Sequence, residues 1–202
     1  LNSSVPLMNK TSIALVGAGG KMGCRLTDNF LKCSDYTVHY LEISPKGLEL
    51  LKTRGVTVSA EAGAIPAADV AILAVPDVAI GAVSRQIVPQ MKPGALLMTL
   101  DPAAPLDGQI ASRPDVGCVI AHPCHPSIFN WEPTEKDFRD FYGGITAKQG
   151  IVCALMHGCE ADYARGVAIA TAMYAPVSRV HRVTLEQMAI LEPAMVETLA
   201  QT

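Results

Sequence analysis

A short phrase near the N-terminus constrains the fold more than any other part of the chain. Residues 12–23 read S-I-A-L-V-G-A-G-G-K-M-G, an apolar run followed by a cluster of glycines. The run is typical of a buried parallel strand, and Met22, Leu26 and Phe30 then recur at helical spacing. The glycines allow a tight turn that no Cβ atom obstructs. The phrase therefore predicts a strand, a turn and a helix whose N-terminus binds the pyrophosphate of a dinucleotide.

The spacing of the glycines is a variant of the usual fingerprint. Met22 occupies the position where G-x-G-x-x-G would require a third glycine after Gly17 and Gly19. Gly17, Gly20 and Gly23 give G-x-x-G-x-x-G instead. We expect the whole loop to contact the cofactor. The predicted contact residues are Gly17, Ala18, Gly19, Gly20, Lys21, Met22 and Gly23.

A second strand-like run at residues 36–41 ends at an acidic side chain, Glu42. It follows the glycines by about 20 residues, where an acid binds the ribose 2′-hydroxyl of NAD and repels a 2′-phosphate. Ile43 comes next rather than an arginine, which also favours NAD, although Lys46 and Arg54 lie near enough in sequence to keep NADP possible. The alternative is an ordinary solvated carboxylate at a strand end.

Composition limits the class of protein. The chain has 202 residues, of which 50% are hydrophobic and 17% charged, and its net charge is -3. These values predict a compact, soluble α/β domain, and the absence of a basic run argues against nucleic acid as a partner. The cysteine pattern, together with the lack of an export signal, predicts a cytoplasmic location. No apolar stretch is long enough to span a bilayer, so we expect no membrane association. Residues 1–8 lack the order of a signal peptide, and we interpret them as a tag remnant or a disordered start.

The cysteines follow no metal-binding or redox pattern. None of the six forms a C-x-x-C pair, so we expect reduced thiols, neither a disulfide framework nor a zinc site. Their positions are Cys24, Cys33, Cys118, Cys124, Cys153 and Cys159.

Strand and helix patterns alternate along most of the chain. Strands are predicted at residues 12–17, 36–42, 56–59, 69–75, 95–101, 116–121, 151–156 and 177–183. Helices are predicted at residues 20–32, 45–54, 77–90 and 160–174. This alternation predicts a Rossmann-like, doubly wound and mostly parallel sheet over residues 9–183, with the ligands at the carboxyl ends of the strands.

A last helix is predicted from residue 185 to the end of the chain. Thr184 and Gln187 form a capping-box pattern at its start, and Pro193 inside it can kink it. We expect residues 184–202 to begin a truncated, helical C-terminal domain. The apolar residues of this helix predict a large partner surface, either for the rest of that domain or for a second subunit of a homodimer. They are Leu185, Met188, Leu191, Met195 and Leu199.

Two strand ends carry candidate cofactor contacts. Val75, Pro76 and Asp77 close the strand at residues 69–75, either as a wall of the cofactor site or as a plain strand terminator. Asp101, at the end of the strand at residues 95–101, either faces the cofactor and substrate or caps a turn that the following prolines already favour. We group these four residues with the cofactor-binding loop.

A pair of histidines follows the strand at residues 116–121. His122 and His125 lie in A-H-P-C-H-P-S, at a carboxyl end where ligands of such sheets bind. Oxidation of a secondary alcohol needs a base that takes the hydroxyl proton, and a histidine titrates in the required range. The two histidines are the candidate catalytic residues. The alternative is a pair of loop histidines bonded to the backbone.

Carboxylates on the last helix suggest a metal site. Glu186 and Glu192 could lie at an interdomain cleft and bind a hard divalent cation such as Mg²⁺. A solvated charged face is the alternative, and we prefer it for Glu197.

Residues 10–202 resemble the 6-phosphogluconate dehydrogenase-like oxidoreductases, which include prephenate dehydrogenases and ketol-acid reductoisomerases. The G-A-G-G-K-M-G loop and the V-P-D segment carry this resemblance. The motifs H-P-C-H-P-S-I-F-N-W-E, G-G-I-T-A-K-Q and H-R-V-T-L-E-Q-M-A-I-L-E-P resemble a narrower group with a phosphogluconate-dehydrogenase-type C-terminal domain, which includes the D-apionate oxidoisomerases. The resemblance implies NAD-linked oxidation of a branched sugar acid coupled to a 1,2-shift.

The same resemblance assigns roles to residues. It implies that His122 is the catalytic histidine and that Glu186 is a metal ligand of the kind that reductoisomerases use for Lewis-acid catalysis of the shift. Arg182 stands where the reductoisomerases have an aspartate, which argues against a two-metal site.

Two other functions fit the sequence. Cys124 in C-H-P-S resembles the nucleophile of semialdehyde dehydrogenases, although the prolines at positions 123 and 126 do not favour the helix that would lower its pKa. Alternatively, the chain is an NAD-binding module that is inactive without its substrate domain.

Overall fold

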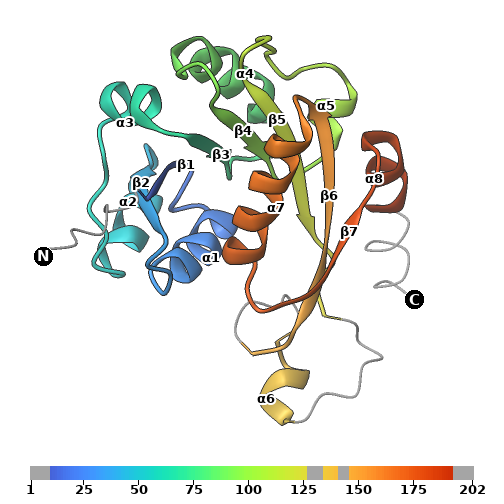
Figure 1. Cartoon of the computed structure of the whole chain (residues 1–202). Coiled ribbons are helices and arrows are strands. Elements are labelled where there is room, and N and C mark those ends of the chain that lie inside the picture. Colours follow the sequence, from blue (N-terminus) through green and yellow to red (C-terminus); the bar gives the residue numbers. More distant parts are fainter. Residues whose placement is uncertain (1–9, 127–133, 141–145, 193–202) are drawn as a thin grey trace, which may run out of the picture.

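The sheet is wound outward in both directions from its first strand (Figure 1). The computed structural model describes residues 10–126, 134–140 and 146–192. Within them, seven strands form one sheet in the order β2-β1-β3-β4-β5-β6-β7. Helices cover both of its faces, as the predicted Rossmann-like fold requires. The expected fold class is confirmed.

The elements have the following bounds. The strands are β1 (Thr11–Val16), β2 (Tyr36–Leu41), β3 (Val70–Leu73), β4 (Leu96–Thr99), β5 (Gly117–Pro123), β6 (Gln149–His157) and β7 (Val177–Arg182). The helices are α1 (Lys21–Phe30), α2 (Pro45–Lys52), α3 (Glu61–Ala67), α4 (Asp77–Ile87), α5 (Ala103–Leu106), α6 (Glu135–Phe138), α7 (Glu160–Met173) and α8 (Leu185–Glu192).

The first five strands are parallel, and the chain reverses direction afterwards. β1 pairs with β2 on one side and with β3 on the other, so the loop after β1 lies at the topological switch point where such sheets bind ligands. β6 is antiparallel to β5, with Pro123 opposite Ile151, and β7 is parallel to β6. In the described residues, β5 is therefore the last strand whose carboxyl end reaches this edge.

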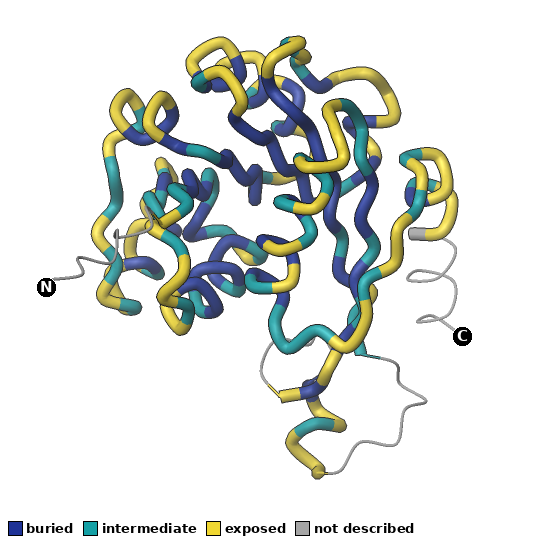
Figure 2. Tube along the Cα trace, in the orientation of Figure 1, coloured by how far each residue is buried: buried dark blue, intermediate teal, exposed yellow. Residues whose placement is uncertain are grey.

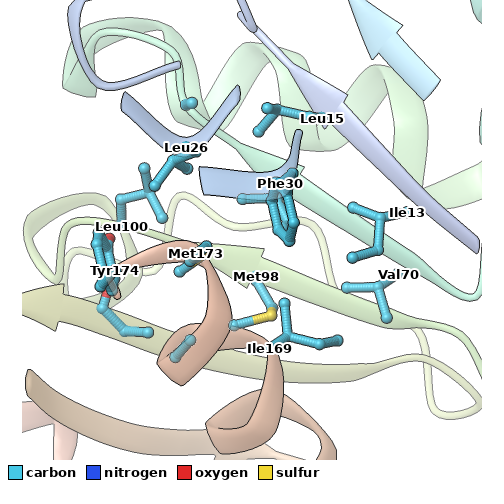
Figure 3. Close-up of a cluster of buried hydrophobic side chains, with 14 of the residues drawn as sticks. Ile13, Leu15, Leu26, Phe30, Val70, Met98, Leu100, Ile169, Met173 and Tyr174 are labelled. Atoms are coloured by element: carbon cyan, nitrogen blue, oxygen red, sulfur yellow. The ribbon is translucent and has the colours of Figure 1, made fainter. Parts of the chain in front are cut away.

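Alternating strand residues fill a core on each face of the sheet. Ile13 and Leu15 point to the face covered by α1 and α7, whereas Ala14 points to the face covered by α3 and α4. Figure 3 shows side chains of α1, α7 and the strands gathered in the first core. Figure 2 shows the central strands β3, β4 and β5 as deeply buried, whereas the edge strands β2 and β7 are more exposed.

Two buried polar side chains fix α7 in place. The Asn29 amide, on α1, donates hydrogen bonds to the carbonyl oxygens of Met173 and Ala175, at 2.9 and 3.1 Å. The hydroxyl of Tyr174, which is 2% exposed, donates to the Ala121 carbonyl oxygen on β5 at 2.9 Å. Because buried polar groups must be paired, these bonds specify how α1, α7 and β5 meet.

Several local predictions differ from the structure. Residues 56–59 do not form a strand, because only Val58 pairs, in an isolated bridge to Tyr40. The helix α3 was not predicted, since E-A-G-A-I-P-A carries a glycine and a proline among its alanines. Residues 1–8 and Pro193 lie outside the described residues.

The start of α8 agrees with its predicted capping box. The Thr184 amide donates to Gln187 Oε1 at 2.9 Å, and the Gln187 amide donates to Thr184 Oγ1 at 3.1 Å. Met188 is 1% exposed and packs on Ile120 and Ala154 of the sheet. Part of the apolar face that we assigned to a partner is therefore covered by this chain itself.

Two further findings concern the helices and the cysteines. No helix among the described residues is long and apolar enough to cross a membrane. All six cysteines are free thiols.

An ion pair at the opposite edge of the sheet gives a test of the fold. Asp69 Oδ2 accepts a hydrogen bond from the Ser12 amide, and Oδ1 lies 2.7 Å from Lys92 Nζ. Burial alone would raise the pKa of the Asp69 carboxyl, but the hydrogen bonds from Lys92 and Ser12 outweigh it and lower the pKa. The charged carboxylate therefore stabilises the folded state above its ordinary pKa of 3.8, and this contribution is lost as the pH falls through the lowered value.

We predict that Asp69→Asn lowers the free energy of unfolding by about 1 kcal/mol at pH 7, mainly through the weakened bond to the Ser12 amide, because the exposed ion pair contributes little. Urea denaturation at pH 7 and at lower pH should show the loss shrinking as the carboxyl protonates. Asp35→Asn, at an exposed carboxyl before β2, is the control. An equal loss at every pH would contradict the prediction.

Candidate active site

A cavity of about 300 Å³ opens at the carboxyl edge of the parallel strands. It combines the start of α1 with the segments that follow β3 and β4 and with the end of β5. Its lining residues are Gly20, Lys21, Met22, Ala74, Val75, Pro76, Asp77, Leu100, Asp101, His122, Pro123 and His125. The structure therefore brings most of the predicted cofactor-binding residues together with both predicted catalytic histidines.

Glycines let the loop after β1 press against its neighbours. Gly17 has φ +78°, and a Cβ atom there would lie 2.6 Å from the Ala74 carbonyl oxygen at the end of β3. A Cβ at Gly23 would overlap the Gly17 carbonyl oxygen and lie 2.7 Å from the Ala18 carbonyl carbon. α1 can therefore begin directly at the strand end. Its N-cap, Gly20, has no side chain that would cap the first amides, so they can bind phosphate oxygens.

The glycines of the loop differ in how much space a Cβ atom would have. A Cβ at Gly20 would come no closer than 3.2 Å to the Gly17 carbonyl oxygen, whereas one at Gly19 would overlap the backbone of Gly47. Gly17, Gly19 and Gly23 are thus the positions that sterically require glycine. Gly20, which the variant spacing groups with Gly17 and Gly23, has more room for a Cβ atom and lines the cavity.

Glu42 lies beside the glycine loop, as its spacing predicted. Its Oε2 accepts a hydrogen bond from the Gly19 amide at 2.9 Å, and its Oε1 accepts from the Ile43 and Ser44 amides at 2.8 Å each. Burial alone would raise the pKa of the Glu42 carboxyl, but these hydrogen bonds outweigh it and hold the pKa below its usual range. Glu42 is therefore a fixed negative charge and not a freely solvated carboxylate.

His122, on β5, is oriented by the backbone of the neighbouring strand end. Its Nδ1 lies 2.8 Å from the Leu100 carbonyl oxygen. A carbonyl can only accept, so Nδ1 carries the proton of this bond, and the lone pair of the neutral ring is on Nε2. Nε2 is the atom that can take a proton from a substrate.

Two carboxyl groups share the cavity with His122. Burial raises the pKa of Asp77, the negative charge of Asp101 raises it further, and His122 opposes the shift. Asp101 Oδ1 also accepts a hydrogen bond from the Ala103 amide at 2.7 Å. Asp101 therefore caps a turn and also lines the cavity, while its contact with the cofactor or substrate stays a prediction.

His125 and Cys124 differ in their relation to the cavity. His125 lines it and has φ +58°, in the left-handed region. Cys124 is not among the described residues that line it, and its amide donates to the Gly150 carbonyl oxygen at 2.9 Å. Although Cys124 is an exposed residue, partial burial raises the pKa of its thiol, which disfavours the reactive thiolate.

Of the two predicted metal ligands, Glu186 is exposed at the start of α8 and is not among the described residues that line the cavity. The side chain of Glu192 lies outside the described part of the chain. In the described part of the chain, no group of three or more His, Cys, Asp or Glu side chains could hold a metal ion. The described residues do not fit a metal centre, and the assignment of Glu186 and Glu192 stays a prediction.

The fold and the cavity together define a protein of the Rossmann type with a ligand site at its topological switch point. Comparison with known proteins narrows this class. The family model described as "Phosphogluconate dehydrogenase (decarboxylating) C-term" matches residues 130–202. A D-apionate oxidoisomerase from Cupriavidus necator is 49% identical over 96% of this chain and 70% of its own length. One from Rhizobium rhizogenes is 48% identical over 94% of this chain and 69% of its own length. The chain therefore belongs to the D-apionate oxidoisomerase family, whose members are oxidoreductases.

Solved structures agree with this placement. A protein from Cupriavidus necator called a semialdehyde dehydrogenase NAD-binding protein, crystallised with calcium and NAD, superposes with a TM-score of 0.91 at 48% identity, over 96% of this chain and 70% of its own. An NADH-preferring ketol-acid reductoisomerase from an uncultured archaeon superposes with a TM-score of 0.69 at 20% identity, over 95% of this chain and 58% of its own. The second likeness shows a shared fold.

We predict that Gly23→Ala lowers stability by about 2 kcal/mol, because its Cβ meets rigid backbone and α1 must move away from the loop. The same movement should weaken NADH binding by about tenfold or more. Gly20→Ala, with more room, should lose less stability. Chemical unfolding and NADH fluorescence titration measure the two effects, and equal losses of stability in the two variants would contradict the steric argument.

Proposed function

We propose that this chain binds NAD and takes part in oxidising the secondary alcohol of a small sugar acid related to D-apionate, followed by a 1,2-shift. The observation that carries the proposal is the orientation of His122. The Nδ1–H group of His122 donates to the Leu100 carbonyl oxygen, so the proton acceptor of the neutral ring is Nε2. His122 lines the same cavity as the start of α1. A base beside a dinucleotide site is what alcohol oxidation requires.

The residues fit NAD better than NADP. The first amides of α1 would hold the pyrophosphate, and Glu42 would bind the adenosine ribose and repel a 2′-phosphate. Arg54, one of two cations that kept NADP possible, forms an ion pair with Asp28 at 2.8 Å. The NAD in the related Cupriavidus structure supports the same choice.

NAD, when bound, supplies the hydride acceptor for the reaction. The residues of the chain supply the proton transfer and the orientation of the substrate. His122 Nε2 takes the proton of the substrate hydroxyl, and the nearby carboxyl groups of Asp77 and Asp101 stabilise the positive ring that results. Lys21, in the cavity wall, supplies positive charge for the carboxylate of a sugar acid or for the pyrophosphate.

The 1,2-shift is proposed because the relatives are called D-apionate oxidoisomerases. Such a shift is helped by a Lewis acid, and the predicted Mg²⁺ ligands remain Glu186 and Glu192. We derive no step through a metal, because the described residues do not assemble a site for one. The predictions of a homodimer and of a cytoplasmic location also stay predictions.

A second candidate function is supported by the name of the Cupriavidus structure. A semialdehyde dehydrogenase would use the Cys124 thiolate as its nucleophile. The raised pKa of this thiol disfavours that role, and substitution separates the two functions.

We predict that His122→Asn lowers turnover at least about 100-fold, because it removes the base, while Cys124→Ser leaves most of the activity. NADH formation from D-apionate should be followed for both variants in a form of the chain extended to the length of its relatives. The opposite result would support the semialdehyde dehydrogenase.

We also predict that the 202-residue chain binds NADH but oxidises no sugar acid, whereas the C-terminally extended form does. The chain spans 70% of the Cupriavidus relative, so substrate contacts can lie in the remainder. NADH formation should be measured with tetronic, pentonic and branched sugar acids, with and without magnesium. Turnover by the 202-residue chain would refute the prediction of an inactive module, and no turnover with any acid by the extended form would refute the proposed function.

A further inference from the structure

Gly47 lies where the glycine loop, Glu42 and α2 meet. It is the third residue of α2, and no motif in the sequence singles it out. A Cβ added at Gly19 would overlap the Gly47 backbone, lying 2.5 Å from its Cα. A Cβ added at Gly47 would lie 2.5 Å from Glu42 Cδ and 2.6 Å from Glu42 Oε2. The three residues therefore pack against one another without room for a further carbon atom.

A Cβ atom at Gly47 would displace the side chain of Glu42. The three nearest atoms all belong to Glu42, the third being Cγ at 2.7 Å. A side chain can move more easily than a backbone segment, and alanine is a better helix former than glycine. The fold can therefore accommodate the substitution by moving the Glu42 side chain. The carboxylate of Glu42, however, must leave its place.

That place is defined by three backbone amides. Glu42 accepts from Gly19 through Oε2 and from Ile43 and Ser44 through Oε1. A carboxylate pushed aside by a Cβ cannot keep all three bonds, because the three donors are backbone amides of the glycine loop and of the turn before α2 and converge on one position. The negative charge would then no longer be fixed where the adenosine ribose is expected.

We propose that Gly47 is the positioning residue that sets the preference for a ribose 2′-hydroxyl over a 2′-phosphate. Its missing side chain creates the space in which Glu42 is held, and Glu42 in that space excludes the phosphate. The inference rests on the proposed function, since it assumes that a dinucleotide binds at this edge.

The test compares the Kd values of NADH and NADPH, by fluorescence titration, in the wild type and in Gly47→Ala. The control is Gly63→Ala, a helical glycine in α3 with no atom within 4 Å of its added Cβ. Gly47→Ala should raise the Kd of NADH about tenfold and lower the ratio of the NADPH Kd to the NADH Kd by at least that factor, as expected for a lost charged hydrogen bond. Gly63→Ala should change neither Kd.

A double-mutant cycle with Glu42→Ala separates positioning from general damage. With Glu42 truncated, the Cβ introduced at position 47 meets no carboxylate, so Gly47→Ala should leave both Kd values unchanged in that background. An effect of the same size in both backgrounds, or a Gly47→Ala protein that behaves like Gly63→Ala, overturns the inference. If Gly47→Ala alone does not fold, recovery of folding in the double variant supports the inference and failure to recover overturns it. A wild type that binds neither nucleotide overturns the proposed function as well.

Discussion

The close contact between the glycine loop and the strand ends around it is the constraint on which the site depends. The amides of Gly17 and Ala18 both donate to the Leu41 carbonyl at the end of β2, while Gly17 also lies against Ala74 at the end of β3. The loop is thus held from both sides of the switch point. Because it cannot move outward, α1 begins at the sheet edge, and its first amides face the cavity that the ends of β3, β4 and β5 complete.

The second half of the chain stabilises the position of α1 by packing against it. α7 packs beside α1 on one face of the sheet, and its C-terminal end is held by Asn29 and by the Tyr174 hydroxyl. Since β6 and β7 run against the first five strands, the described part of this half contributes packing to the site and none of its cavity-lining residues. Among the described residues, those that line the cavity and carry the proposed proton transfer therefore all come before position 127.

Most of the fold could be predicted because its signals are local. Apolar runs such as residues 12–16, helical stripes, and the capping box of Thr184 each depend on a few neighbouring residues. The place of Glu42 beside the glycine loop followed from spacing alone. The direction of β6, the helix α3 and the close packing of Gly19 and Gly47 could not be predicted in this way. They depend on which segments meet in space. Whether a position has room for a side chain larger than glycine can be judged only when its spatial neighbours are known.

His125 has a consequence beyond the cavity that it lines. At φ +58° a histidine has a higher backbone conformational energy than a glycine would have. The loop after β5 is therefore less stable with His125 than it would be with glycine at this position. Glycine at position 125 would relieve this backbone cost but would remove a side chain that lines the cavity, so stabilising the loop and keeping the site intact are opposed here.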